Sequence, residues 1–212
     1  MNCFLDLAVS RRSIRKFEDK EIPVEDIEYF IKAATYAPSG CNSQCWKFIA
    51  VKDRDIIKKI ENIVIQKVDD ILKEKAEELP QSYLASKRKM VSFFAKAPVV
   101  IAVFMTKAKF YDETFISVLK EQGHDNKSIM DIFANYDILS IGAAIQNMLL
   151  AIHEKGYGAC WMNEPAIAGK DINEVLGISL DKRFISLIPV GIPAYTPREK
   201  KIKSMDEVFS IV

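Results

Sequence analysis

Asp137 to Lys155 reads DILSIGAAIQNMLLAIHEK, and this stretch decides the fold. Its isoleucine, leucine and methionine residues recur every three or four positions, which is the spacing of one face of an α-helix. Leu139, Ala143 and Leu150 make the opposite face apolar as well. A helix that is apolar nearly all round must be buried on several sides. One layer of sheet covers one side only, so we expect a second copy of the chain to cover the other.

The segments before and after this helix show both helix and strand patterns. Pro23 suits a first helical turn, and Ile27, Phe30 and Ala34 follow it at helical spacing. Val99 to Met105 is a continuous apolar run, typical of a strand buried on both faces. We therefore predict one α+β domain over residues 1–212. Helices are expected at 3–10, between Pro23 and Pro38, at 54–79 and at 83–96. The third of these helices has an apolar stripe of Ile57, Ile60, Val64, Val68 and Ile71. Strands are expected at 46–51, 99–105, 159–163 and 185–191.

Residues 107–136 show no clear period, although the segment is rich in aromatic side chains. We interpret it as an excursion from the domain or a lid. Core packing is the expected role of at least half of its aromatic residues. They are Phe110, Tyr111, Phe115, Phe133 and Tyr136.

The composition narrows the class of protein. Hydrophobic residues make up 49% of the 212 positions, enough for a globular core. Lys and Arg number 30 against 29 Asp and Glu, whereas nucleic-acid binders carry a basic excess, so no nucleic-acid partner is expected. The longest apolar run, Ala97 to Met105, is far shorter than a membrane span, and Met1 to Arg12 lacks the features of a signal peptide. Together with four scattered cysteines (Cys3, Cys41, Cys45 and Cys160), these features predict a cytoplasmic protein with free thiols and no membrane association.

A basic cluster follows the first expected helix. Arg11, Arg12, Ser13 and Arg15 place three guanidinium groups and one hydroxyl within five residues. Guanidinium groups match phosphate oxygens, and each hydrogen bond to a charged group contributes about 1.5–3 kcal/mol. The cluster indicates a phosphate site, and the alternative is a solvated basic end of a helix.

The loop from Pro38 to Gln44 is small and polar. Gly40 lets a flat ligand approach the main chain closely. Asn42 and Gln44 offer paired donors and acceptors, which can recognise an amide-like edge. The alternative interpretation is an ordinary connector between a helix and a strand.

Four motifs, in the same order along the chain, resemble those of nitroreductase-family flavoproteins. They are RRSIRKF at 11–17, APSGCNSQCWKF at 37–48, GAAIQNMLLAIHEKGYGACWMN at 142–163 and IPVGIPAYTPREKKIK at 188–203. The resemblance implies a three-layer α+β fold with a central mixed, mainly antiparallel sheet flanked by helices. It also implies a homodimer with the long helix at its interface and with FMN bound between the two subunits.

The resemblance also assigns roles to individual residues. Arg11, Arg12 and Ser13 would hold the phosphate and ribityl end of FMN, and Arg15 would lie toward the pyrimidine edge of the ring. The other expected FMN contacts are Ser39, Gly40 and Asn42 from the partner subunit, with Pro38 and Gln44 in the same loop; Trp161, Met162 and Asn163 along the ring; and Arg198, Lys201 and Lys203 at the phosphate. Two departures from the family pattern concern the loop and the tail: Cys45 replaces the usual Pro, and Ile202 and Ser204 replace a basic residue and a Pro.

Rival interpretations start from the thiols and the histidines. A zinc site needs about four ligands, and no such set accompanies Cys41 and Cys45, so no metal is expected. A redox pair of these two thiols stays an alternative. Neither His124 nor His153 lies in a motif typical of a hydrolase, so no residue is assigned a catalytic role and the flavin would carry the chemistry. Cys160 is expected to pack beside the flavin, and Phe115 or Phe133 could form a wall over it.

From this resemblance we expect the protein to be a reductase with a ping-pong mechanism. NADH or NADPH would reduce the flavin, and a small electron-poor acceptor such as a nitroaromatic or a quinone would reoxidise it. Two alternatives stay open. One is a specialised flavoenzyme such as a reductive dehalogenase, and the other is a non-catalytic FMN-binding or redox-sensing module.

Overall fold

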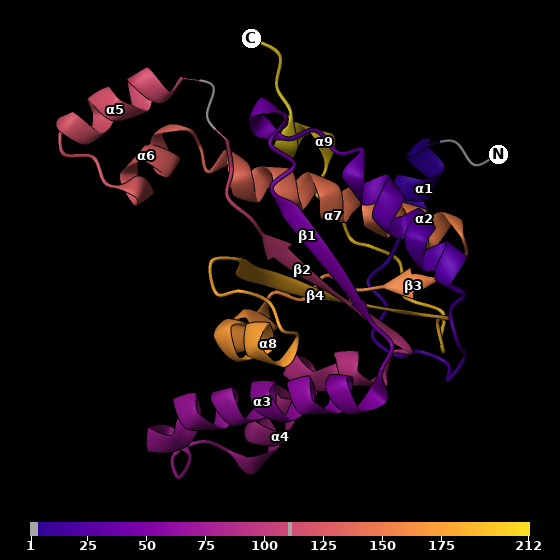
Figure 1. Cartoon of the computed structure of the whole chain (residues 1–212). Coiled ribbons are helices and arrows are strands. Elements are labelled where there is room, and N and C mark those ends of the chain that lie inside the picture. The colour runs from indigo at the N-terminus through magenta and orange to yellow at the C-terminus, as the bar shows by residue number, and fades with distance from the viewer. Residues whose placement is uncertain (1–3, 110–111) are drawn as a thin grey trace.

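The structure is a computed structural model that describes residues 4–109 and 112–212. Cys3, Phe110 and Tyr111, which the sequence analysis singled out, lie outside the described residues. The helices are α1 (Phe4–Ser10), α2 (Val24–Thr35), α3 (Arg54–Leu72), α4 (Gln81–Ser92), α5 (Glu113–Glu121), α6 (Asn126–Ile132), α7 (Tyr136–Glu154), α8 (Gly169–Val175) and α9 (Met205–Val208). The strands are β1 (Trp46–Val51), β2 (Val99–Met105), β3 (Gly158–Ala159) and β4 (Arg183–Gly191) (Figure 1).

The four described strands form one sheet in the order β1-β2-β4-β3, and each pair of neighbours is antiparallel. A parallel bridge joins Ser13 to Ala159 beside the β3 edge. β2 is buried on both faces, as its unbroken apolar sequence predicts. Its alternate residues enter two different cores: Ile101 and Val103 point to one, and Ala102 and Phe104 point to the other.

Helices cover both faces of the sheet, which confirms the three-layer α+β fold (Figure 1). α2 and α7 pack together over one face, and Phe30 of α2 is fully buried there. α3, α4 and α8 lie on the other face. α3 begins where the Asp53 carboxylate accepts hydrogen bonds from the backbone N–H groups of Asp55 and Ile56, at 2.9 and 3.0 Å.

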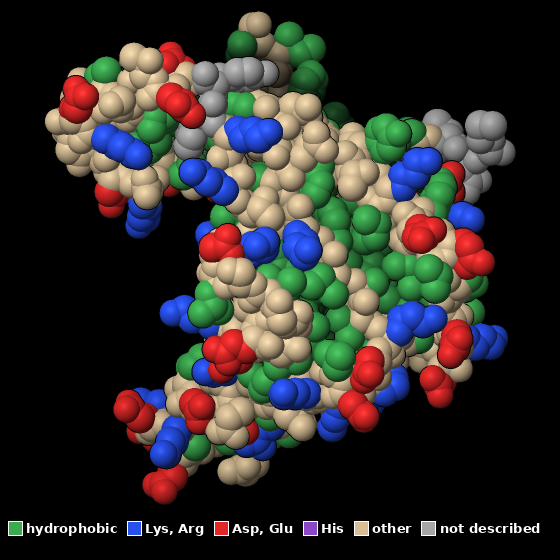
Figure 2. Space-filling view, viewed as in Figure 1, with side chains coloured by type: hydrophobic (Ala, Val, Ile, Leu, Met, Phe, Trp, Pro, Cys, Tyr) green, Lys and Arg blue, Asp and Glu red, His purple; other side chains and the backbone are tan. Residues whose placement is uncertain are grey.

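α7 occupies the expected stretch to within one residue at each end. Ile141, Ile145 and Met148 are fully buried against the sheet and α2. Leu139 on the opposite side is 63% exposed. Ala143 and Leu150 on that side are half-buried, so the single chain covers this side of the helix incompletely. Figure 2 shows further apolar side chains gathered across the middle of the displayed face, around β1.

Several expected boundaries are wrong. α3 ends at Leu72 rather than at residue 79, and Ile71 is 67% exposed because the end of the helix runs beyond the sheet (Figure 1). The second helix, expected at 83–96, is α4 followed by a 3-10 turn at Phe93–Lys96. The strand expected at 159–163 is reduced to β3 and an isolated bridge between Met162 and Leu187. α8 was not predicted at all.

The excursion at 107–136 contains two short helices, α5 and α6, which project away from the body of the domain (Figure 1). Asp112 caps α5 through the backbone N–H of Phe115, and Asp125 caps α6 through that of Ser128, both at 2.8 Å. The rings of Phe115 and Phe133 meet edge to face at 6.2 Å. These two aromatic residues contact each other, but Phe115 is 47% exposed, so its ring does not lie in a core in the single chain.

In the described part of the chain no single helix is both long enough and apolar enough to cross a membrane, although the bent pair α6 and α7 meets the criteria of length and composition together.

The two sides of α7 should respond differently to truncation. Ile145→Ala leaves a cavity in the core, and we expect it to lower the free energy of unfolding by about 2–5 kcal/mol at any protein concentration. Leu139→Ala should cost little in a single chain, and its cost should grow with protein concentration if a second copy covers that side. Urea unfolding at two concentrations measures both. If Leu139→Ala lowered the free energy of unfolding as much as Ile145→Ala does, and by the same amount at both protein concentrations, this assignment of faces would be contradicted.

Candidate functional site

The basic cluster lies on an extended segment held between β3 and the tail. The backbone N–H of Ile14 donates to Ala159 at 2.9 Å, and on the other side that of Ala194 donates to the carbonyl of Lys16 at 3.1 Å. Gly158 permits the close contact, because a Cβ there would lie 2.5 Å from the Ile14 side chain. Neighbouring side chains of an extended segment point to opposite sides.

The three arginines of the cluster are not equivalent. Arg12 donates from Nη1 to the carbonyls of Val9 and Arg11, and from Nε to the carbonyl of Arg198 at 3.3 Å. It therefore ties the tail to the end of α1. Within the described residues, no hydrogen bond or ion pair engages the Arg11 guanidinium, and Arg15 makes one long contact of 3.4 Å to the Ser13 carbonyl. Arg11 and Arg15 keep their donors available for a ligand.

The segment expected to run along a flavin ring begins two residues after Ala159, which pairs with Ser13 of the cluster. Met162 is buried and exchanges two backbone hydrogen bonds with Leu187, at 3.0 and 3.1 Å. Trp161 is 37% exposed and donates from Nε1 to the Asn163 side chain at 2.8 Å. Its ring packs against α7 at Gly142. The exposed side chain of this segment is thus the Trp161 indole, whose orientation is fixed by its hydrogen bond to the Asn163 side chain.

Trp161 and Asn163 also line a groove of about 830 Å³ beside the first turns of α7. That volume lies within the range of small-molecule sites. The α7 wall is apolar, and the opposite wall carries three cations, Lys170, Lys182 and Arg183. The sequence analysis missed these cations, because Lys170 lies on the short helix α8, whereas Lys182 and Arg183 lie in the turn before β4 and at its first residue.

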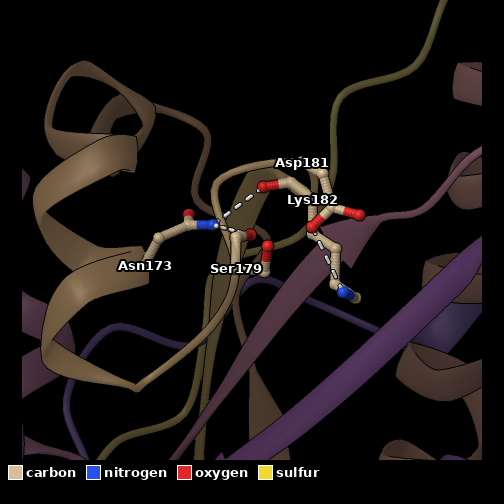
Figure 3. Close-up of polar contacts among 4 residues, drawn as sticks. All are labelled: Asn173, Ser179, Asp181 and Lys182. Atoms are coloured by element: carbon tan, nitrogen blue, oxygen red, sulfur yellow. Dashed lines mark hydrogen bonds and ion pairs between the residues drawn. The ribbon is translucent and has the colours of Figure 1, made fainter.

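Asn173 of α8 shapes this cationic wall (Figure 3). Its side chain is 2% exposed and donates from Nδ2 to the carbonyls of Ser179 and Lys182, at 3.1 and 2.8 Å. These bonds hold the turn that leads into β4, where Lys182 also pairs with Asp181 at 3.3 Å. A buried amide that satisfies two backbone carbonyls is a structural anchor.

The loop from Pro38 to Gln44 has an unusual backbone. Cys41, Asn42 and Gln44 adopt positive φ values of 56°, 46° and 45°. Residues with a Cβ rarely adopt such angles, and strain of this kind gathers at ligand sites. Side-chain hydroxyls hold the loop: the Gly40 N–H donates to Ser140 at 3.1 Å, and the Gln44 N–H donates to Ser39 at 3.0 Å.

The structure keeps this loop away from the basic cluster. Gly40 is bonded to Ser140 near the start of α7, whereas Ser10 contacts His153 at its end, 2.8 Å from Oγ to Nε2. The two contact points on α7 are thirteen residues apart, or about 20 Å at 1.5 Å per residue. The Trp161 ring packs at Gly142, two residues from Ser140, so the Trp161–Asn163 segment and the loop meet α7 near its start, whereas the residue before the cluster, Ser10, meets its end.

The tail is only partly joined to the site. Arg198 meets the cluster through its carbonyl, which accepts from Arg12. Lys201 and Lys203 are exposed, and within the described residues neither makes a hydrogen bond or an ion pair. Their expected phosphate contact stays a prediction.

The two buried thiols, Cys45 and Cys160, are not activated. Cys45 is fully buried and Cys160 nearly so, and burial raises the pKa of each thiol above its ordinary value. A raised pKa disfavours the thiolate that redox exchange needs, so this structure does not favour a switch that uses Cys45. Among residues 4–109 and 112–212, no three His, Cys, Asp or Glu side chains gather into a metal-binding group.

Comparison with known proteins places this geometry in context. Residues 8–192 match the nitroreductase family. An iodotyrosine deiodinase from Thermotoga neapolitana is 28% identical over 200 residues, which cover 91% of this chain and 90% of that protein. The crystal structure of a BluB-like flavoprotein from Clostridium difficile 630 is 30% identical, with a TM-score of 0.86 and complete coverage of both chains. A nitroreductase with bound FMN from Desulfitobacterium hafniense is 19% identical and shares the fold, with a TM-score of 0.72 over the whole of both chains.

The different contacts of Arg11 and Arg12 predict different phenotypes. Arg11→Ala should weaken FMN binding about ten- to a hundredfold, because it removes one charge-assisted contact to phosphate. Arg12→Ala should instead free the tail, which limited proteolysis near Arg198 would detect, with a smaller change in affinity. Flavin titration compares the two variants. Equal losses of affinity, or an unchanged affinity in Arg11→Ala, would contradict this division of roles.

Proposed function

The chain belongs to the nitroreductase family, and from this premise we propose that it is an FMN-dependent oxidoreductase that works as a homodimer. NADH or NADPH would serve as the electron donor and a small electron-poor molecule, such as a nitroaromatic or a quinone, as the acceptor. The observation that carries the proposal is the availability of two guanidinium groups on a backbone fixed beside Ala159: within the described residues Arg11 makes no hydrogen bond or ion pair, and Arg15 makes one long contact only.

The described residues suit FMN better than FAD. Arg11 and the Ser13 hydroxyl would hold a terminal phosphate, and a phosphate dianion matches a guanidinium fork well. The donors nearest to Arg11 are already occupied, since Arg12 is bonded to three carbonyls. That leaves the Arg11 guanidinium as the available partner next to Ser13, and we infer that it takes one phosphate rather than the diphosphate of FAD. When bound, the flavin supplies hydride transfer between the two substrates.

Arg15 and Trp161 would act on the ring itself. A cation at the pyrimidine edge favours negative charge there, and this interaction is strengthened when water is excluded. The indole of Trp161, fixed by Asn163, would form an apolar wall that keeps water from the ring. The apolar side of the 830 Å³ groove would continue that wall toward the acceptor.

A second copy of the chain would complete the site. The loop at Gly40 and the segment at Ser10 contact α7 near opposite ends, about 20 Å apart along the helix, and we infer that the loop serves the site of a second copy rather than that of its own chain. The exposed Leu139 side of α7 supplies an apolar surface for pairing. In a two-fold dimer that packs these surfaces together, the loop of one copy can reach the cluster of the other.

Reductive dehalogenation is the second candidate function. The similarity to an iodotyrosine deiodinase extends over 91% of this chain and favours this alternative. In this chain both functions would use the FMN site proposed above, and they would differ in the molecule that takes the electrons.

Cofactor identity and turnover test the proposal together. Acid release from the purified protein should yield FMN at about one per chain, identified by chromatography. The holoprotein should oxidise NADH or NADPH when a quinone or nitroaromatic is added, and iodide release from iodotyrosine is the matched assay for the second candidate. Recovery of FAD, or of no flavin even after reconstitution, would rule the proposal out.

Dimerisation is tested best at Leu139. Because this side chain is exposed in the single chain, Leu139→Glu should leave the fold intact, whereas Ile145→Glu would place an unpaired charge in the core and cost several kcal/mol. We expect Leu139→Glu to sediment as a folded monomer that retains little FMN. A variant that stays dimeric, or a monomer that binds FMN as tightly as the wild type, would contradict the shared site.

A further inference from the structure

A small, mainly apolar pocket borders the basic cluster. Its volume is about 160 Å³, and Ser10, Arg11, Arg12 and His153 contribute to its polar part. His153 belongs to the last turn of α7, and the other three residues belong to the end of α1 and the segment after it. One imidazole and the guanidinium proposed to hold the cofactor phosphate therefore border the same cavity.

The hydrogen bonds around Ser10 define the protonation of His153. The Ser10 hydroxyl donates to the Asp6 carbonyl at 2.6 Å, because a carbonyl can only accept. Its oxygen must then accept from His153 Nε2, at 2.8 Å. The neutral imidazole thus carries its hydrogen on Nε2, and Nδ1 is the atom that would take up a second proton.

The surroundings of His153 disfavour the binding of a second proton to its imidazole. Partial burial lowers the pKa of His153 below its ordinary value, and the positive charges of Arg11 and Arg12 lower it further. Charged or titratable groups on the neighbouring elements include Asp6 on α1, Asp26 and Tyr29 on α2, Glu154, Lys155 and Tyr157 near the end of α7, and Arg198 in the tail. The groups of α2 and the end of α7 engage one another, since Glu154 accepts from Tyr29, and Asp26 pairs with Lys155 and accepts from Tyr157.

We propose that His153 takes up a proton when a phosphate-bearing cofactor binds at Arg11, so that retention of the cofactor is coupled to pH. The inference rests on the proposed function, because the phosphate of FMN supplies the negative charge. His153 is a positioning residue in this scheme. It acts through the field of Arg11 and need not touch the cofactor.

The sign of the coupling follows from the charges. A phosphate dianion offsets the positive field of Arg11, which removes part of what keeps the imidazole neutral, so the pKa of His153 rises on binding. By linkage, the affinity for FMN then increases as the pH falls. The increase begins near the pKa of His153 in the FMN-bound protein and is complete below the pKa of His153 in the flavin-free protein. A rise of roughly one pH unit corresponds to about a tenfold change in affinity across that interval.

The chain has two histidines, so His124→Gln leaves His153 as the only imidazole. NMR titration of that ring should give a pKa below 6.5 without flavin and a value roughly one unit higher with FMN. Riboflavin, which lacks the phosphate, should leave the pKa unchanged. Arg11→Ala should raise the pKa of the flavin-free form and reduce the response to FMN.

Binding measurements provide the second readout. Gln at position 153 keeps a side-chain N–H donor for Ser10 but does not titrate, so His153→Gln is the matched variant. The FMN phosphate itself titrates near pH 6, and the ratio of wild-type to His153→Gln affinity between pH 5 and 8 cancels that effect. We expect this ratio to rise about tenfold toward low pH.

Different outcomes overturn different claims. If FMN binds but the pKa of His153 stays constant or falls, the proton coupling is wrong and the proposed function stands. An equal pKa shift with riboflavin also overturns the coupling, because the phosphate would not be its cause. Failure of the wild-type protein to bind FMN at any pH overturns the proposed function itself.

Discussion

α7 is apolar on more sides than one chain covers, and the other elements are arranged around it. The sheet and α2 bury its Ile145 side completely, and the Leu139 side stays open. Hydrophobic burial contributes about 25 cal/mol per Å² of apolar surface, so an open apolar face this close to the core is a strong drive to associate. The same helix sets the distance between the loop at Gly40 and the cluster at Arg11, because each is hydrogen-bonded near a different end of it. Core packing, assembly and the division of the site therefore depend on one element.

The site combines rigid backbone with unengaged side chains. Around the cluster, β3 and the tail hold the main chain on both sides, while Arg12 uses its donors on carbonyls and leaves Arg11 and Arg15 available. The loop at 38–44 shows the same combination, with strained φ angles held by Ser39 and Ser140. Such prior ordering lowers the entropy lost when a ligand binds. The exposed cations of the tail, Lys201 and Lys203, lack this ordering in the single chain.

Much of the fold could be predicted from the sequence, because its main elements have strong periods. β2 and α7 are long apolar patterns, and their bounds were predicted to within one residue. α5, α6 and α8 were missed, since helices of seven to nine residues depend on a cap such as Asp112 or Asp125 and on tertiary contacts more than on a visible stripe. The outer turns of α3 were misjudged because periodicity identifies a face but does not show where the sheet beneath it ends. At the site, residue types and motifs were enough to predict the cluster and the loop. They could not predict the different contacts of Arg11 and Arg12 or the hydrogen bond between His153 and Ser10, because these contacts depend on segments that are distant in the sequence.

The central claim is that each flavin site takes its basic cluster from one chain and its loop from another. Co-expression of an Arg11→Ala chain with a Gly40→Ala chain tests it most directly, at an FMN concentration that leaves Arg11→Ala dimers unfilled. Gly40→Ala displaces the loop, because its Cβ would lie 2.0 Å from the Tyr136 ring. In a mixed dimer, a shared site places both defects at one position and leaves the other intact, so we predict about one FMN per mixed dimer and almost none in either parent. If each site lay within a single chain, both sites of the mixed dimer would be defective, and a mixed dimer that binds no more FMN than its parents would contradict the claim.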